Sequence, residues 1–157
     1  MPVIGPEQLG RFFDEHARAL TLYARQWSDA PEDVVQDAFV SLARQRSVPD
    51  RVVPWLYRVV RNAAIASSRG SRRRQRREAK AATNGACFAS TDDRIDAADA
   101  SRLLAGLDEE TREVIVARIW GGLTFEEVAN LQGCSLTTAH RRYQAGLARL
   151  QMRLEPS

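Results

Sequence analysis

Apolar residues recur at steps of three and four along most of the chain, a spacing typical of helices that bury one face. It predicts helices over residues 7–27, 30–46 and 54–70, the second opened by a capping box of Asp29 and Glu32. No run alternates apolar and polar residues, so the fold is expected to be all-α. The inward faces are predicted to hold Leu9, Phe12, Phe13, His16, Leu20, Tyr23 and Trp27, then Val35, Ala38, Phe39 and Leu42, then Leu56, Val59, Val60, Ala63 and Ala64.

Two short helices meet at a tight turn between residues 123 and 150. Thr124 and Glu127 form a capping box, Gly133 ends the first helix because glycine adopts positive φ without strain, and Ser135 caps the second. The pattern favours a DNA-reading helix-turn-helix, with an ordinary helical hairpin as the alternative. Its buried positions are predicted to be Val128, Ala129, Leu131, Leu136, Ala139, Tyr143, Leu147 and Leu150, and its polar face Thr137, Thr138, His140, Arg141, Gln144 and Arg149.

The chain divides into two small helical domains. Residues 81–100 are poor in apolar side chains and rich in small and acidic ones, which indicates a linker between domains at 1–80 and 101–157. The second domain is expected to contain one more helix, capped by Asp108 and stopped by Gly121 and Gly122. That helix is predicted to bury Val114, Ile115, Ala117, the Arg118 stem and Ile119.

Charge is segregated into blocks. The net charge of the 157 residues is +3, but residues 69–80 hold seven basic and one acidic side chain, and residues 81–110 hold two basic and seven acidic ones. A basic block this dense suits a polyanion, and a solvated arm, helical or flexible, is the alternative. The acidic segment is interpreted as a solvated linker; screening of the DNA-binding surface is the other hypothesis.

Chemistry-bearing residues are few. Cys87 and Cys134 lie far apart, with neither histidine at ligand spacing, so no metal or other cofactor is expected, and Cys134 is expected to pack in the turn. No nucleophile with its base and no phosphate-binding loop is present, which argues against an enzyme. Without a charged leader or a long apolar run, the protein is expected to be cytoplasmic, with no membrane insertion.

The third helix carries aromatic groups among basic ones, namely Trp55, Tyr57, Arg58, Arg61 and Asn62. Bases stack on such rings while guanidinium groups hold phosphates, an arrangement suited to single-stranded nucleic acid. From the helix alone, completion of a small core by Trp55 and Tyr57 is the better interpretation.

Three segments together resemble the extracytoplasmic-function sigma factors of bacterial RNA polymerase, and the resemblance covers nearly the whole chain. DAPEDVVQDAFVSLAR is similar to the polymerase-docking helix of that family, PWLYRVVRNAAI to its promoter-melting helix, and the stretch from residue 107 to residue 150 to its −35 reading domain. One helix-turn-helix is a weak signal, but three segments in this order form a specific one. A stand-alone helix-turn-helix regulator is the alternative, although no dimerisation element is visible, and an RNA-binding role would leave the second domain unexplained.

The resemblance implies partners and residue roles. Core RNA polymerase would bind through the clamp helices of its largest subunit and through its flap, promoter DNA would be the second partner, and an anti-sigma factor is left open. The implied polymerase-binding residues are Asp33, Gln36, Asp37 and Phe39; the −10 residues are Trp55, Arg58, Arg61 and Asn62; the −35 residues are Thr137, Thr138, His140, Arg141, Arg142 and Gln144.

Three features depart from the family pattern. The loop at 45–53 is shorter than in many members and lacks their Phe-Arg-Gly-like segment, which bears on the −10 base preference. His140 stands where a basic residue is frequent, and the run of arginines after Arg69 is denser than the family requires.

Overall fold

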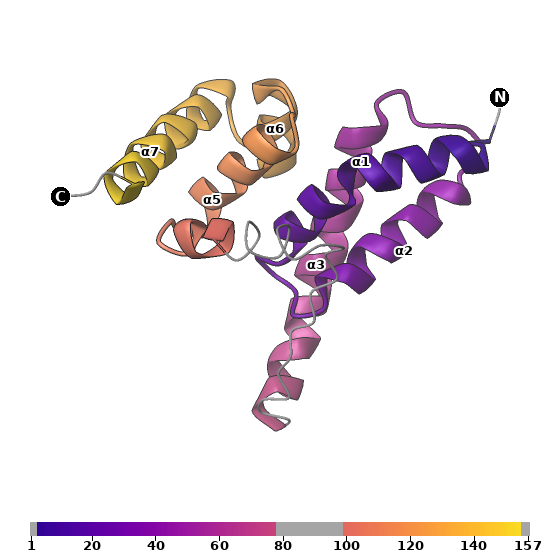
Figure 1. Ribbon diagram of the computed structural model, residues 1–157, viewed down its shortest axis with the longest axis horizontal. Helices are drawn as coiled ribbons and strands as arrows, with labels where there is room; N and C mark the ends of the chain where they lie inside the picture. Colours follow the sequence, from indigo (N-terminus) through magenta and orange to yellow (C-terminus); the bar gives the residue numbers. More distant parts are fainter. Residues whose placement is uncertain (1–2, 78–98, 155–157) are drawn as a thin grey trace. The chain divides into compact units, whose positions relative to one another are not determined.

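The computed structural model describes residues 3–77 and 99–154, with side chains given for 3–68 and 99–153. Within these ranges every regular element is helical, as the spacing of apolar residues predicted (Figure 1). The chain divides into two compact units, Met1–Cys87 and Phe88–Ser157. Cys87 and the predicted linker up to residue 98 lie outside the described residues.

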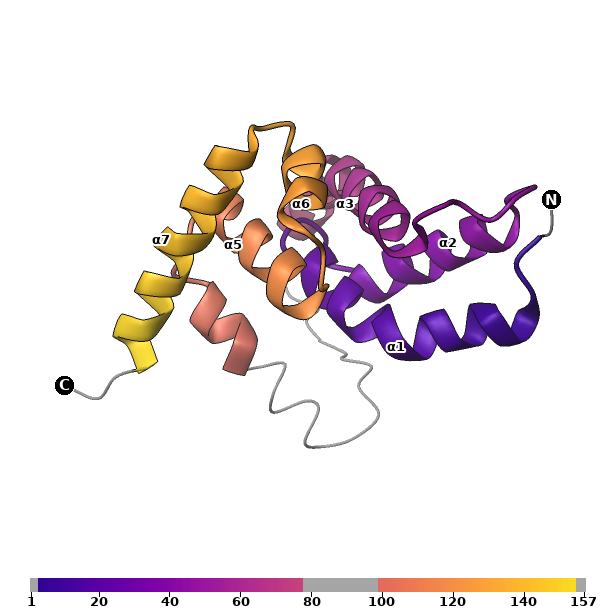
Figure 2. The ribbon, with the colours of Figure 1, turned by 90° about the horizontal axis from the view of Figure 1, so that it is seen from above.

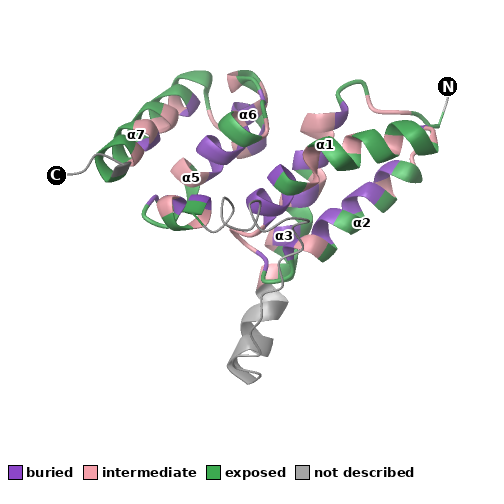
Figure 3. Cartoon of the chain, in the orientation of Figure 1, coloured by how far each residue is buried: buried purple, intermediate pink, exposed green. Residues whose placement is uncertain are grey.

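The first unit consists of three helices, α1 (Pro6–Ala24), α2 (Pro31–Ala43) and α3 (Val52–Arg77), which pack against one another (Figure 1). The described part of the arginine-rich segment continues α3 to Arg77, so it is a helical extension and not a flexible arm. The core of the unit is built from side chains with no exposed surface, namely Leu20, Tyr23, Leu42, Leu56, Tyr57 and Val60. Figure 3 shows buried residues on all three helices, alternating with exposed and intermediate ones.

Tyr57 belongs to this core, as the interpretation from the helix alone favoured. Its ring packs 4.9 Å from that of Tyr23, and burial raises the pKa of its hydroxyl. Ala63 and Phe13, by contrast, were predicted to face inward and are exposed. The prediction therefore included too many residues in the inward faces, because packing among only three helices leaves part of each apolar stripe uncovered.

The predicted capping box at the start of α2 is wrong. Ala30 is the N-cap residue and no side chain caps the helix; Ser28 Oγ instead accepts a hydrogen bond of 3.0 Å from the Ala30 N–H. Pro31 occupies the first helical position, where its fixed φ already starts the helix. The helix ends at Ala43, three residues before the predicted end, and the Gln45 side chain donates to the Ser41 carbonyl.

The second unit contains α5 (Glu109–Ile115), the π-helical segment η1 (Val116–Trp120), α6 (Phe125–Gln132) and α7 (Leu136–Leu154). Residues 99–104 are also helical. Asp108 caps α5 as predicted, accepting a 3.1 Å bond from the Thr111 N–H, and its hydrogen bonds to Thr111 lower the pKa of the carboxyl. Figure 2 shows α7 running beside α5 within this unit, and α6 joined to the start of α7 by a short turn.

The helix predicted up to Gly121 is interrupted by the π-helical segment. The Gly121 N–H donates to the Val116 carbonyl five residues earlier at 3.0 Å. This wider turn rotates the residues within it about the helix axis, relative to an α-helix. Ile119, which was predicted to be buried, is therefore 47% exposed. Val114, Ile115 and Ala117 are fully buried, as predicted.

Close packing of α5 and α7 depends on Gly146. A Cβ atom there would lie 2.7 Å from Cγ1 of Ile115, closer than side chains tolerate. Leu136, Leu147 and Leu150 of α7 were predicted to be buried, but Leu147 and Leu150 are only partly buried and Leu136 is 44% exposed. Because a glycine lies at the crossing, α7 approaches α5 closely at Gly146, beside Ile115 and Thr111.

Candidate nucleic-acid interface

The predicted polymerase-binding residues lie on α2 and divide into two groups. Asp33, Gln36 and Asp37 are exposed and, at steps of three and four, share one face of the helix. Phe39 is only 5% exposed, and its ring meets that of Phe13 edge-on at 5.1 Å between α2 and α1. The polar residues therefore form a solvent-facing acidic surface, and Phe39 supports the helix from beneath.

The predicted −10 residues follow the outer side of α3. Arg58 and Asn62 are exposed, whereas Trp55 and Arg61 are half-buried. The Arg61 guanidinium lies 5.7 Å from the ring centroid of Trp27, which follows α1 and was assigned only to the core stripe. No sequence pattern predicts this pairing, because the two residues are far apart in the chain and only the packing of α1 on α3 brings them together.

The helix-turn-helix has the capping geometry that the sequence predicted. Thr124 Oγ1 accepts from the Glu127 N–H at 3.1 Å and the Glu127 carboxylate accepts from the Thr124 N–H at 2.9 Å. Gly133 has φ 66°, in the left-handed region, and the Cys134 N–H donates back to the Ala129 carbonyl at 3.0 Å. The next helix starts at once, since Ser135 Oγ accepts from the Thr138 N–H at 3.1 Å.

The polar face of α7 is open to solvent over most of its predicted residues. Thr137, His140, Arg141 and Gln144 are exposed, and Thr138 is half-buried with its hydroxyl 2.9 Å from that of Ser135. These side chains combine donors and acceptors that suit base edges with cations that suit phosphates.

Arg142, the sixth predicted −35 residue, is held within the unit. Its guanidinium pairs with Glu110 of α5 and donates at 2.8 Å to Oε1 of Gln132, the last residue of α6. Gln132 in turn donates to the Glu110 carbonyl at 2.9 Å and to the buried Glu113 carboxylate at 3.2 Å. The network joins α5, α6 and α7, so Arg142 fixes the angle at which α7 leaves the turn.

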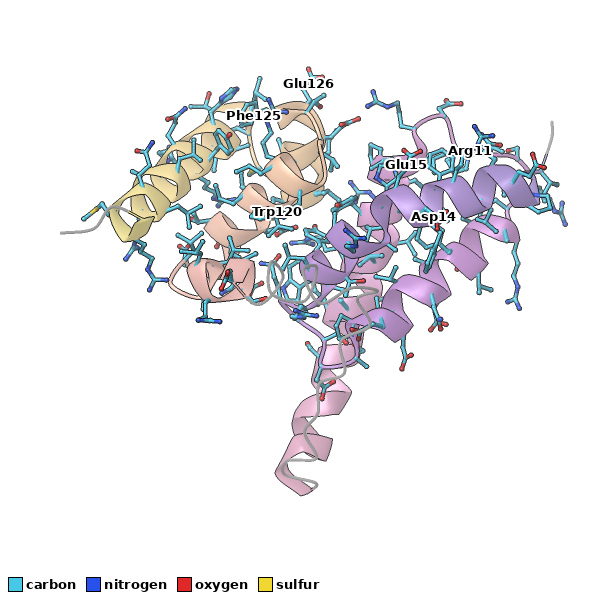
Figure 4. All side chains as sticks on the ribbon, viewed as in Figure 1. Arg11, Asp14, Glu15, Trp120, Phe125 and Glu126 are labelled. Atoms are coloured by element: carbon cyan, nitrogen blue, oxygen red, sulfur yellow. The ribbon has the colours of Figure 1, made fainter. Side chains whose placement is uncertain are left out.

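An aromatic stack also supports α7, and the sequence analysis did not foresee it. The Phe125 ring lies against the His140 imidazole, with centroids 3.8 Å apart and an interplanar angle of 28°, and Figure 4 labels Phe125 at the start of α6. The Arg118 guanidinium lies 4.5 Å from the same ring centroid. Neither contact is visible in the sequence, because each depends on the crossing angle of elements joined by turns.

Within 3–77 and 99–154 no group of three potential metal ligands gathers, and Cys134 is half-buried with a free thiol. None of the helices described there is long and apolar enough to span a bilayer.

Comparison with known families gives two matches. Residues 12–77 match the family described as sigma-70 region 2, and residues 98–150 match sigma-70 region 4. The first covers α1 from Phe12, α2 and α3; the second covers the helix-turn-helix unit. A comparison with curated proteins gave no significant match.

Two solved structures are similar over nearly the full chain. CnrH, solved with the cytosolic domain of CnrY, shares 26% identity at a TM-score of 0.63, covering 96% of this chain and 89% of CnrH. The sigma factor RpoE of Bartonella quintana, solved with the anti-sigma factor NepR, shares 23% identity at a TM-score of 0.67, covering 96% of this chain and 99% of RpoE. With sigma-70 regions 2 and 4 in order and this fold around them, the chain belongs to the sigma-70 family and is a promoter-directing sigma factor of the extracytoplasmic-function type.

Proposed function

We propose that this sigma factor binds core RNA polymerase through α2 and holds promoter DNA at two points, through α3 and α7. In this proposal residues 1–80 dock on polymerase and open the −10 element, residues 101–157 read the −35 element, and residues 81–100 link them. The protein would act in the cytoplasm as a specificity subunit without catalysis of its own.

The acidic surface of α2 supports the docking role. Asp33, Gln36 and Asp37 are exposed, and Asp33 lies in the first turn of the helix, where the helix dipole favours negative charge. A basic partner surface complements such a patch, and the clamp helices of the polymerase largest subunit are the proposed partner. Phe39 would contribute by keeping α2 seated on α1 and not by direct contact.

The outer side of α3 supports the −10 role. Trp55 offers a partly exposed ring for base stacking, while Arg58 and Arg61 offer cations for the strand backbone, with Asn62 beside them. The Trp27 ring lies next to Arg61 and extends the same aromatic and basic surface onto α1.

The exposed face of α7 is the observation that best supports recognition of the −35 element. The capping box, the glycine turn and the Ser135 cap place Thr137, His140, Arg141 and Gln144 on one open face of a helix that follows a tight turn. This is the arrangement in which a recognition helix enters the major groove. The remaining surface of the second unit is the proposed contact for the polymerase flap.

An anti-sigma protein is proposed as a further partner. The support comes from relatives: RpoE was solved with the anti-sigma factor NepR, and CnrH with the cytosolic domain of CnrY. A partner that covers the docking surface of α2 would compete with polymerase.

Charge reversal on α2 tests the proposal. Asp37→Arg places a cation against a basic partner, and we expect at least a tenfold loss of affinity for bacterial core polymerase, an order of magnitude typical of disrupted charge pairs. The matched control is Glu15→Arg, another exposed carboxylate, on α1. Affinity is measured with labelled full-length chains, and circular dichroism should show unchanged helix content.

The wild-type chain supplies the decisive comparison. It should co-purify with core polymerase and support transcription from genomic promoters in a genome-wide run-off. If Asp37→Arg bound core polymerase as tightly as Glu15→Arg, the docking assignment would be wrong; if the wild-type complex transcribed from no promoter, the proposed function would be wrong.

A further inference from the structure

The stack around Phe125 joins three separate elements of the second unit. Arg118 belongs to η1, Phe125 is the first residue of α6, and His140 lies on α7. Phe125 is half-buried between the other two, and Tyr143 of α7 meets its ring edge-on at 5.2 Å with an interplanar angle of 77°. The aromatic ring therefore has a fixed place against both α7 and η1.

Arg118, which lies against the Phe125 ring, is itself held in place. Its Nη1 donates at 2.9 Å to the Leu123 carbonyl, in the connection between η1 and α6. The guanidinium therefore restrains the ring of Phe125, and the ring restrains the imidazole of His140. Movement of His140 away from this position would lose the stacking contact.

The stack occupies one face of the His140 imidazole and leaves both nitrogens available. No residue within 3–77 or 99–154 forms a hydrogen bond with these nitrogens, and His140 is exposed on the same face of α7 as Arg141 and Gln144. A neutral imidazole offers one N–H donor, and a protonated one offers two. In the major groove guanine is the base that presents two acceptors, N7 and O6, so its edge can accept from one or from both donors of the imidazole.

We propose that His140 is a specificity-determining residue for a guanine in the −35 element, and that Phe125 is the positioning residue that fixes its ring. The inference rests on the proposed function, because it requires α7 to lie in the major groove. It goes further by naming the base that His140 would read and by assigning a role to Phe125, which lies on α6 and not on α7.

Base preference at single positions tests the inference. Holoenzyme is assembled from the full chain and bacterial core polymerase, and it selects from duplex promoters randomised over the −35 region. His140→Ala should lower the preference for guanine at one position about fivefold, the loss of one hydrogen bond. Phe125→Leu should lower the same preference to a similar extent, Phe125→Tyr should retain it, and the double variant should lose no more than His140→Ala alone.

A spectroscopic measurement on the free chain tests the positioning directly. The ring protons of His140 should resonate upfield because they lie over the Phe125 ring, and this shift should disappear in Phe125→Leu and persist in Phe125→Tyr. His16, the other histidine, packs on Phe12 with ring centroids 6.0 Å apart, and its signals should not change. If Phe125→Leu folds poorly, Phe125→Met provides an unbranched side chain of similar size that cannot stack.

The outcomes separate the inference from the proposed function. A purely structural Phe125 would lower selection at all positions alike, and that result would overturn the inference, as would unchanged preferences in Phe125→Leu or additive losses in the double variant. A wild-type holoenzyme with no −35 preference would overturn the proposed function itself, and the inference with it.

Discussion

Arg141 and Arg142 are neighbours in the sequence and have different surroundings. Arg141 is exposed on the open face of α7. Arg142 is half-buried, paired with Glu110 and bonded to Gln132. An exposed arginine can reach a base edge and so suits DNA recognition. An arginine already paired within the domain instead helps to hold α7 against α5 and α6.

Alanine substitution should separate the two roles. Arg141→Ala or Gln144→Ala is expected to weaken −35 selection by about 1–3 kcal/mol at the base concerned. Arg142→Ala is expected instead to lower the free energy of unfolding of the second unit by about 1 kcal/mol, because Gln132 and Glu110 lose a partner. Promoter selection with randomised −35 elements and thermal unfolding measure the two effects; a base-specific loss from Arg142→Ala with unchanged stability would contradict this division.

Tyr57 carries a hydroxyl that the core does not satisfy. Its side chain is fully buried, and no described residue lies within hydrogen-bonding reach of the hydroxyl oxygen. A buried polar group without a partner costs about 1–3 kcal/mol, so Tyr57→Phe is expected to leave the free energy of unfolding unchanged or to raise it by about 1 kcal/mol. Denaturant unfolding measures the difference, with Tyr57→Leu as the control that removes the ring packed on Tyr23 and lowers stability. A loss of more than about 1 kcal/mol in Tyr57→Phe would show that the hydroxyl has a stabilising partner.

The turn between α6 and α7 is the element whose geometry the sequence specified best. Thr124, Glu127 and Ser135 satisfy the N–H groups at the two helix starts, and Gly133 turns the chain at φ 66°. These contacts are local, with partners three to five residues apart, so they do not depend on how distant parts of the chain pack.

Gly133 should tolerate asparagine better than alanine. An alanine held in the left-handed region costs about 1–2 kcal/mol, and asparagine adopts that conformation more readily. No atom lies within 4 Å of a Cβ built there, so the effect is one of backbone conformation and not of packing. Thermal unfolding should therefore rank wild type above Gly133→Asn and Gly133→Asn above Gly133→Ala; equal stability of the two variants would contradict the conformational explanation.

Each unit of the molecule has its own core and its own candidate surface. The charge that serves these surfaces is concentrated, with a net +6 over residues 69–80. The structure describes α3 as continuing to Arg77, so the basic run extends the helix that carries the proposed −10 residues. We expect this block to contribute affinity for DNA without selecting a sequence.

The salt dependence of promoter binding tests this role of the arginines. Replacing Arg72, Arg73, Arg74, Arg76 and Arg77 by glutamine keeps helix propensity and removes five charges. If all five contact phosphates of a single strand, the slope of log affinity against log salt should fall in magnitude by about 3 to 4. Replacement by lysine keeps the charge and should preserve the slope; an unchanged slope in the glutamine variant would indicate a solvated extension.

The all-α fold, the two-unit division and the caps of the second unit followed from the sequence, because periodicity and capping depend on neighbours within a few residues of each other. The same holds for the exposed Asp33, Gln36 and Asp37 of α2 and for the open face of α7. The prediction was wrong where the sequence offered two ways to start a helix. Asp29 and Glu32 suggested a capping box for α2, but the helix starts at Pro31 without a side-chain cap.

Contacts between elements could not be predicted from the sequence and became visible only in the tertiary structure. The burial of Phe39 against Phe13, the pairing of Arg61 with Trp27, and the stack of Arg118, Phe125 and His140 depend on the angles at which helices cross. Those angles result from side-chain volumes summed over whole interfaces, such as the close approach at Gly146, and no short window of sequence contains that sum. Helix identity and capping are therefore local properties of this protein, whereas the positions of Arg142 and His140 are properties of its packing.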